Sequence, residues 1–201
     1  FRSKATMTNA WKLPRIAYFN DRFRDTIKGS TFHLPSRGFA LGDASGREQA
    51  KTVIAGSLRA LGGLFCHPLQ SLNYVECHDN HTFWDKMEVA NGYESEAIRR
   101  KRQKLATAIV LLAQGIPFLH SGQEFYRTKG GDGNSYQAPD EVNWIDWEQK
   151  SRYENDVRYV QGLIALRRAH GAFRLATEAE VLRHFEFLEP TPPSVIAYWL
   201  R

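Results

Sequence analysis

The sequence predicts an α/β fold built on a parallel sheet. Short apolar segments alternate with longer segments of helical periodicity, and the long polar loops consistently come after the apolar segments. Parallel strands need long crossover connections, usually helices, so this alternation favours repeated β-loop-α units. After residue 173 the pattern changes to alternating apolar residues interrupted by prolines. We therefore expect an α/β part at 1–172 and the start of an antiparallel β-sandwich domain at 173–201.

The first unit has an apolar strand at 15–19 and a helix at 47–61, with a polar loop between them. Ile54, Leu58 and Leu61 recur at helical spacing and predict one buried face. Two glycines at 62–63 then provide a stop, because glycine adopts the left-handed conformation that ends many helices.

The second unit has a strand at 71–77 and a helix at 91–114, which begins with a capping box made by Asn91 and Glu94. The densest basic run of the chain, 99–104, lies inside this helix. The apolar positions of the helix keep to one side; they are Ile98, Leu105, Ala108 and Leu112. The basic side chains are therefore expected to point to water, which argues against a nucleic-acid site.

The third unit has a strand at 116–122, a glycine-rich polar loop at 127–147 and a helix at 153–170. Val157, Val160 and Ile164 predict the buried face of this last helix.

Composition places the chain among globular proteins and leaves its compartment open. It has 201 residues, 42% of them hydrophobic, a formal net charge of +5 and two cysteines, too few for a disulfide framework. No apolar run has the length of a membrane-spanning helix. The first residues lack the apolar core of a secretion signal, which fits either a cytosolic protein or a chain whose true N-terminus is missing.

Acidic side chains come after each predicted strand: Asp21 after the first, Asp79 after the second and Glu124 after the third. In parallel α/β folds the loops at the carboxyl ends of the strands build the active site. The stretch YVECHDNHTFWDK at 74–86 is the densest in chemically active side chains. Position and composition both make it the candidate site.

Spacing alone leaves three interpretations open. The first is a metal site, whose ligands would be Cys77, His78, Asp79 and His81. Adjacent residues of an extended chain point to opposite sides, so such a site needs a sharp turn. The second is glycoside hydrolysis, in which carboxylates stabilise an oxocarbenium-like transition state and aromatic rings stack on sugars. The aromatic candidates are Phe83, Trp84, Tyr126, Tyr136, Trp144 and Trp147. The third is that these residues serve only the fold.

Four collinear segments resemble one known family. The stretch 74–86 is similar to the fourth conserved region of the α-amylase superfamily, in the extended form found in type I pullulanases. Three other segments resemble the same enzymes: YFNDRFRDTIKGSTF at 18–32, the segment 113–147 that begins with AQGIPFLHSGQEF, and LIALRRAHGAFRL at 163–175. The resemblance implies that 1–172 holds strands six to eight of a TIM (β/α)8 barrel.

The resemblance implies hydrolysis of α-1,6 branch linkages in pullulan, amylopectin and related α-glucans, with retention at the anomeric carbon. Asp79 matches the carboxylate that stabilises the transition state, and His78 matches the histidine that hydrogen-bonds the same sugar. Five further residues fall in segments that line the substrate groove: Asn80, Asn134, Tyr136, Asp140 and Asn143. Glu124 and Asp21 are assigned no catalytic role, and Asp21 is expected to order its loop through ion pairs with neighbouring arginines.

The chain departs from the family in an important respect. The nucleophile and the acid/base of these enzymes come after the fourth and fifth barrel strands, and no segment of this chain matches those strands. A retaining glycosidase needs two such carboxyls about 5 Å apart. We therefore expect this chain to be the C-terminal part of a longer enzyme, unstable and inactive alone, whose protein partner is the remainder of its own catalytic domain.

The same resemblance implies several further expectations. Three alternatives to a pullulanase-type function remain: an isoamylase, an α-glucan branching enzyme and a non-catalytic glucan-binding module. An α-glucan is the expected partner, and nucleic acid is not. No metal site or cofactor is expected in this region, while calcium elsewhere in a longer enzyme and a secreted or cell-surface location both fit the family. Cys77 stands where relatives often carry serine.

Overall fold

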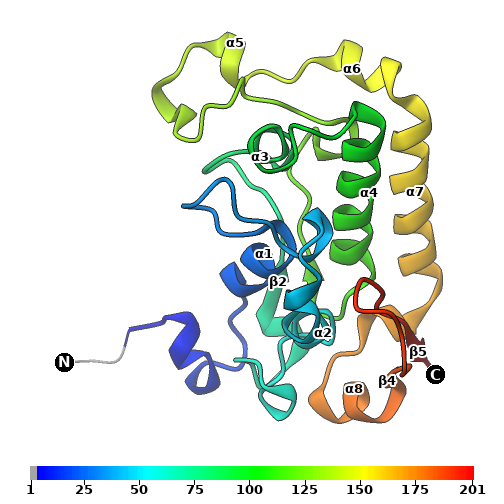
Figure 1. The fold of residues 1–201 in the computed structure, drawn as a ribbon. Helices are drawn as coiled ribbons and strands as arrows, with labels where there is room; N and C mark the ends of the chain where they lie inside the picture. Colours follow the sequence, from blue (N-terminus) through cyan, green and yellow to red (C-terminus); the bar gives the residue numbers. More distant parts are fainter. Residues whose placement is uncertain (1–3) are drawn as a thin grey trace.

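A three-stranded parallel sheet forms the centre of the computed structural model, which describes residues 4–201 (Figure 1). Its strands are β1 (Tyr18–Phe19), β2 (Ser71–Asn73) and β3 (Ile116–Pro117). Tyr18 pairs with Ser71 and Leu72 pairs with Ile116, so the order is β1-β2-β3. The predicted parallel sheet is confirmed, although each strand is shorter than its apolar segment.

Two buried asparagines hold the sheet where the backbone ladder ends. The Asn20 amide donates hydrogen bonds of 2.8 Å to the hydroxyls of Ser57 and Ser71. The Asn73 amide donates one of 2.8 Å to the backbone oxygen of Gln114. Buried polar groups need hydrogen-bond partners, and these side-chain hydrogen bonds supply them at the ends of the short strands.

The helices match the predicted units only in part. They are α1 (Asp21–Lys28), α2 (Arg47–Ile54), α3 (Phe83–Ala90), α4 (Glu96–Leu112), α5 (Asp140–Asn143), α6 (Trp147–Arg152), α7 (Glu154–Ala169) and α8 (Glu178–His184). Figure 1 shows α4 and α7 lying side by side. The helix predicted at 153–170 is confirmed by α7, and Val157 and Val160 are buried as predicted, but the prediction is wrong for Ile164, which is 37% exposed.

Two helices occupy stretches that were expected to be loops. Asn20 caps α1 by accepting from the amide of Phe23, and Thr82 caps α3 by accepting from the amide of Asp85. The predicted capping box at Asn91 is wrong, because Asn91 ends α3 and α4 begins only at Glu96. The helix predicted at 47–61 ends at Ile54, before a separate short turn at Arg59–Leu61.

The predicted buried face of α4 is also wrong. Ile98 and Leu105 are 45% and 44% exposed, while Ala106 and Val110 pack in the core. Lys101 of the basic run is exposed as predicted, but the other four basic side chains do not point freely to water, because they lie in partly buried ion pairs. The pairs are Arg99 with Glu88, Arg100 and Lys104 with Asp156, and Arg102 with Glu94. Acids on α3, on α7 and in the turn before α4 thus pair with basic side chains of this helix.

The tail forms α8 and an antiparallel hairpin of β4 (Phe185–Phe187) and β5 (Tyr198–Leu200). Antiparallel pairing agrees with the predicted alternation, whereas α8 was not predicted. Phe185 and Tyr198 stack on each other and pack against the main core. Among residues 4–201, no helix is both long and apolar enough to cross a membrane.

Candidate active site

The candidate site lies on the loop that joins β2 to α3, at the carboxyl edge of the parallel sheet. His78 and Asp79 project from it into solvent, with side chains 85% and 70% exposed. The Nε2 atom of His78 lies 3.4 Å from Oδ1 of Asp79. Asn80 comes next with a φ of +64°, a left-handed conformation that asparagine tolerates, and it turns the chain sharply. The pair is therefore presented at the tip of a turn.

A buried acid fixes the base of this loop. Glu76 is 1% exposed, accepts a 2.5 Å hydrogen bond from the amide of Phe83 and lies 3.1 Å from Nδ1 of His120. The other ring nitrogen of His120 lies 3.2 Å from the guanidinium of Arg127. A buried carboxylate with several hydrogen-bond partners fixes the positions of the groups around it. Glu76 was not among the predicted site residues. Its position, as an acid inside the predicted strand 71–77, was a signal that it has a special role.

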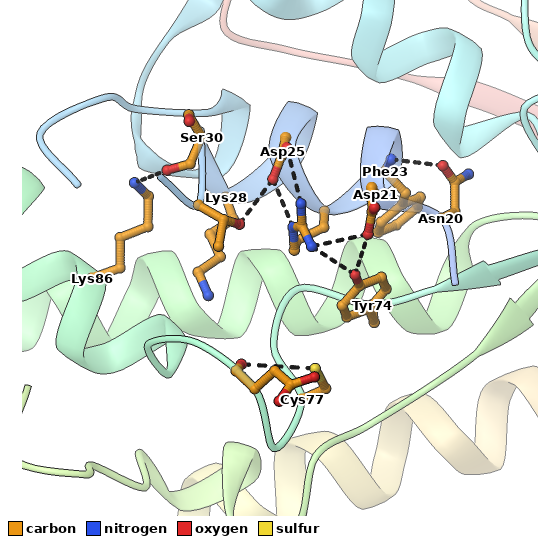
Figure 2. A network of polar contacts seen from close by, with 12 residues as sticks. Asn20, Asp21, Phe23, Asp25, Lys28, Ser30, Tyr74, Cys77 and Lys86 are labelled. Atoms are coloured by element: carbon orange, nitrogen blue, oxygen red, sulfur yellow. Dashed lines mark hydrogen bonds and ion pairs between the residues drawn. The ribbon is translucent and has the colours of Figure 1, made fainter. Parts of the chain in front are cut away.

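A second polar network joins the loop to α1 (Figure 2). The hydroxyl of Tyr74 donates a 2.6 Å hydrogen bond to Asp21 and accepts one of 2.9 Å from Arg24. Arg24 also forms ion pairs with Asp21 at 2.9 Å and with Asp25 at 2.7 Å. Burial raises the pKa of Tyr74, so its hydroxyl keeps the proton it donates. Asp21 was expected to order a loop through ion pairs with arginines; it does pair with Arg24, but it begins helix α1 and is not part of a loop.

Buried lysines complete the support of the loop. Lys28 of α1 and Lys129 donate to the backbone oxygens of His81 and His78, on either side of Asp79. Lys86 of α3 is buried too, but it donates to the oxygens of the 30–34 segment. Figure 2 shows Lys28 and Lys86 leaving α1 and α3. No sequence signal identifies these lysines, because lysine is almost always exposed.

The remaining predicted groove residues lie on the segment 134–143. Tyr136 is 76% exposed, and Asn134 and Asp140 are exposed as well. Asn143 uses its side-chain amide inside the segment, accepting from the Ser135 hydroxyl at 2.9 Å and donating to the Ser135 backbone oxygen at 2.7 Å. These hydrogen bonds stabilise the segment 134–143. Asn80, in contrast, lies on the loop that carries Asp79.

The chain just before this segment touches the loop of Asp79 through Gly133. A Cβ atom at Gly133 would lie 2.3 Å from Cε1 of the His81 ring, a distance that side chains do not tolerate. The close approach brings the 128–134 chain against the loop that carries Asp79.

The residues of the metal interpretation come together only in part. Ligand atoms of Cys77, His78 and Asp79 lie within 4.8 Å of one another, and His81 is not in this group. Burial raises the pKa of the Cys77 thiol, which disfavours the thiolate that binds metals or reacts. Glu124, the acid after the third predicted strand, lies apart from this group and is partly buried in the short turn Gln123–Phe125.

Comparison with known proteins identifies relatives along almost the whole chain. A pullulanase from Bacillus subtilis (strain 168) is 52% identical over 187 residues, which are 92% of this chain and 26% of the relative. The crystal structure of a pullulanase complexed with maltotriose, from Anoxybacillus sp. LM18-11, is 65% identical, with a TM-score of 0.94 over 98% of this chain and 27% of that chain. The chain matches a region of type I pullulanases.

The predicted resemblance is thereby confirmed, and it extends beyond pullulanases. An isoamylase from Flavobacterium sp is 27% identical over 169 residues, 69% of this chain and 22% of the relative. No family model matches the sequence. The chain spans about a quarter of the length of the pullulanases it matches.

Proposed function

We propose that this chain serves the hydrolysis of α-1,6 branch linkages in pullulan, amylopectin and related α-glucans. One observation carries the proposal: the pullulanase that shares 65% identity over 98% of this chain was crystallised with maltotriose. The exposed His78 and Asp79 pair, at the carboxyl edge of the sheet, supplies polar groups where a sugar could bind.

Asp79 stabilises the transition state in this proposal, and His78 hydrogen-bonds the same sugar. An ionised carboxylate accepts hydrogen bonds from two hydroxyls at once. Bonds that tighten as the ring flattens towards the oxocarbenium ion lower the barrier instead of merely binding substrate. The high exposure of both side chains supports the assignment, because neither side chain is needed to stabilise the fold.

The nucleophile and the acid/base of the reaction lie outside this chain in our proposal. They form a pair about 5 Å apart in a retaining glycosidase. The coverage of about a quarter of each relative supports a division of the active site between this chain and the remainder of a longer catalytic domain.

The proposed architecture agrees with that division. β1, β2 and β3 become strands six to eight of a (β/α)8 barrel over 1–172, and 173–201 begins a C-terminal β-sandwich domain. The consecutive parallel order of the three strands and the antiparallel β4-β5 hairpin support this assignment.

The substrate groove is proposed to include five further residues: Asn80, Asn134, Tyr136, Asp140 and Asn143. Exposure of Asn134, Tyr136 and Asp140 supports contact with a glucan, and Asn143 shapes the segment that carries them. The chemistry proposed for this region uses no cofactor.

A second candidate is an isoamylase-type or branching activity, favoured by the similarity to the Flavobacterium isoamylase. Incubation of the complete protein that carries this chain with pullulan and with amylopectin separates a debranching hydrolase from a branching enzyme and from a glucan-binding module. A debranching hydrolase releases reducing ends from α-1,6 linkages, a branching enzyme transfers chains without releasing reducing ends, and a glucan-binding module binds without either change. Failure to cleave α-1,6 linkages would reject the proposed function.

A further inference from the structure

The backbone on both sides of Asp79 is tied to buried ammonium groups. Lys28 is 1% exposed and donates a 2.6 Å hydrogen bond to the backbone oxygen of His81. Lys129 is 3% exposed and donates to the backbone oxygen of His78. One lysine comes from α1 and the other from the chain after β3, so two distant segments hold the loop at either side of Asp79.

These lysines are costly groups to bury, and carboxylates do not compensate for them directly. Within the described residues 4–201, none of the salt bridges involves Lys28 or Lys129. Burial lowers the pKa of Lys28 to about 8 and also lowers that of Lys129. The ammonium groups therefore rely on carbonyl dipoles of the candidate loop. A hydrogen bond to a charged donor is stronger than one between neutral groups, so these bonds fix the loop firmly.

The Asp79 carboxylate has little support of its own. Its side chain is 70% exposed, and His78, which lies within ion-pair distance of it, is 85% exposed. The position of the carboxylate is therefore set by the backbone that carries it. We propose that Lys28 and Lys129 are positioning residues, which hold this backbone so that Asp79 meets the sugar in the reactive geometry. The inference rests on the function proposed above.

Three matched substitutions test this in the complete protein: Lys28→Met, Lys129→Met and, as control, Lys86→Met. Lys86 is 0% exposed and donates to the backbone oxygens of Ser30 and Leu34, and not to the loop that carries Asp79. The readouts are kcat and KM on an α-1,6-linked oligosaccharide, and the melting temperature. Since small misplacements of catalytic groups are costly, kcat should fall roughly tenfold or more in the first two variants, with little change in KM. Lys86→Met should lower the melting temperature but leave kcat unchanged.

A double-mutant cycle with Asp79→Asn separates positioning from general damage. If the lysines act through Asp79, adding Lys28→Met or Lys129→Met to Asp79→Asn lowers kcat no further. Losses that multiply, or an equal loss of kcat in Lys86→Met, would overturn the inference. Should a methionine variant fail to fold, the shorter glutamine variant replaces it, and an unchanged kcat in that folded variant overturns the inference too. Wild-type protein without α-1,6 cleavage would instead defeat the proposed function itself.

Discussion

The ammonium of Lys28 lies 2.6 Å from the backbone oxygen of His81, a residue 53 positions later in the chain. This bond joins α1 to the loop that presents Asp79, two residues before His81. The exposed pair at the tip of the loop is thus held by groups that water does not reach. Because His78 and Asp79 are exposed, substituting them should alter the proposed site without unfolding the protein.

The substitution Asp79→Asn should lower kcat about a hundredfold or more, because transition-state bonds worth several kcal/mol lose their charged acceptor. It removes charge and hardly changes volume, and Asp79 is exposed, so the melting temperature should stay within about two degrees of wild type. The measurement is kcat on pullulan beside a thermal melt. Glu154→Gln, which alters an exposed acid of α7, is the control. Wild-type activity in Asp79→Asn would contradict its role.

Stability should depend on pH through Lys28, whose pKa falls from 10.5 to about 8 chiefly because it is buried. Glu76 opposes the shift, while Lys86 and Arg24 add to it. Between pH 8 and 10.5 the unfolded chain keeps a proton that the folded chain has released, so this residue makes folding more favourable as pH rises. At about 1.4 kcal/mol per pKa unit, the full effect is about 3 kcal/mol.

Unfolding midpoints of wild type and Lys28→Met at about pH 7.5, 8.5 and 9.5 test the sign. Wild type should gain stability relative to the variant as pH rises through this window. A difference that stays constant, or that shrinks with rising pH, would show that Lys28 keeps an ordinary pKa in the folded protein.

Asp156 should matter to stability far more than Glu154, the other acid of α7. Its side chain is 6% exposed and meets two cations of α4, Arg100 and Lys104, the latter at 2.8 Å. Asp156→Ala leaves both cations without their acid, which should cost about 3 kcal/mol. Glu154→Ala breaks the exposed pair with Arg158 and should cost less than about 1 kcal/mol. Denaturant unfolding of both variants measures the contrast, and equal losses would refute it.

Gly133→Ala should disturb the site more than the fold. The new Cβ would lie 2.3 Å from the His81 ring, so the ring must move, and with it the loop held by Lys28. We expect a several-fold loss of kcat and a destabilisation of about 1–2 kcal/mol. At Gly171 a Cβ meets nothing within 4 Å, so Gly171→Ala is a matched control that should change neither quantity. Unchanged kinetics in Gly133→Ala would show that this contact does not shape the site.

The sequence predicted the parallel sheet because apolar segments and helical periodicity alternate, a pattern that depends little on tertiary contacts. It missed α1 and α3, although their capping residues Asn20 and Thr82 are visible in it. The partial burial of the basic side chains of α4 could not be predicted, since acid partners such as Asp156 lie on another helix and only the folded chain brings them together. The location of Asp79 at a strand end was predictable, whereas the buried lysines behind it were not, because only the folded chain shows what they contact.

The most direct test of the proposed function is the product analysis of pullulan treated with the complete protein that carries this chain. We predict release of maltotriose units through cleavage of α-1,6 linkages, with the new reducing end in the α configuration when first formed. Pullulan left intact, or cleaved at other linkages, would contradict the proposed function.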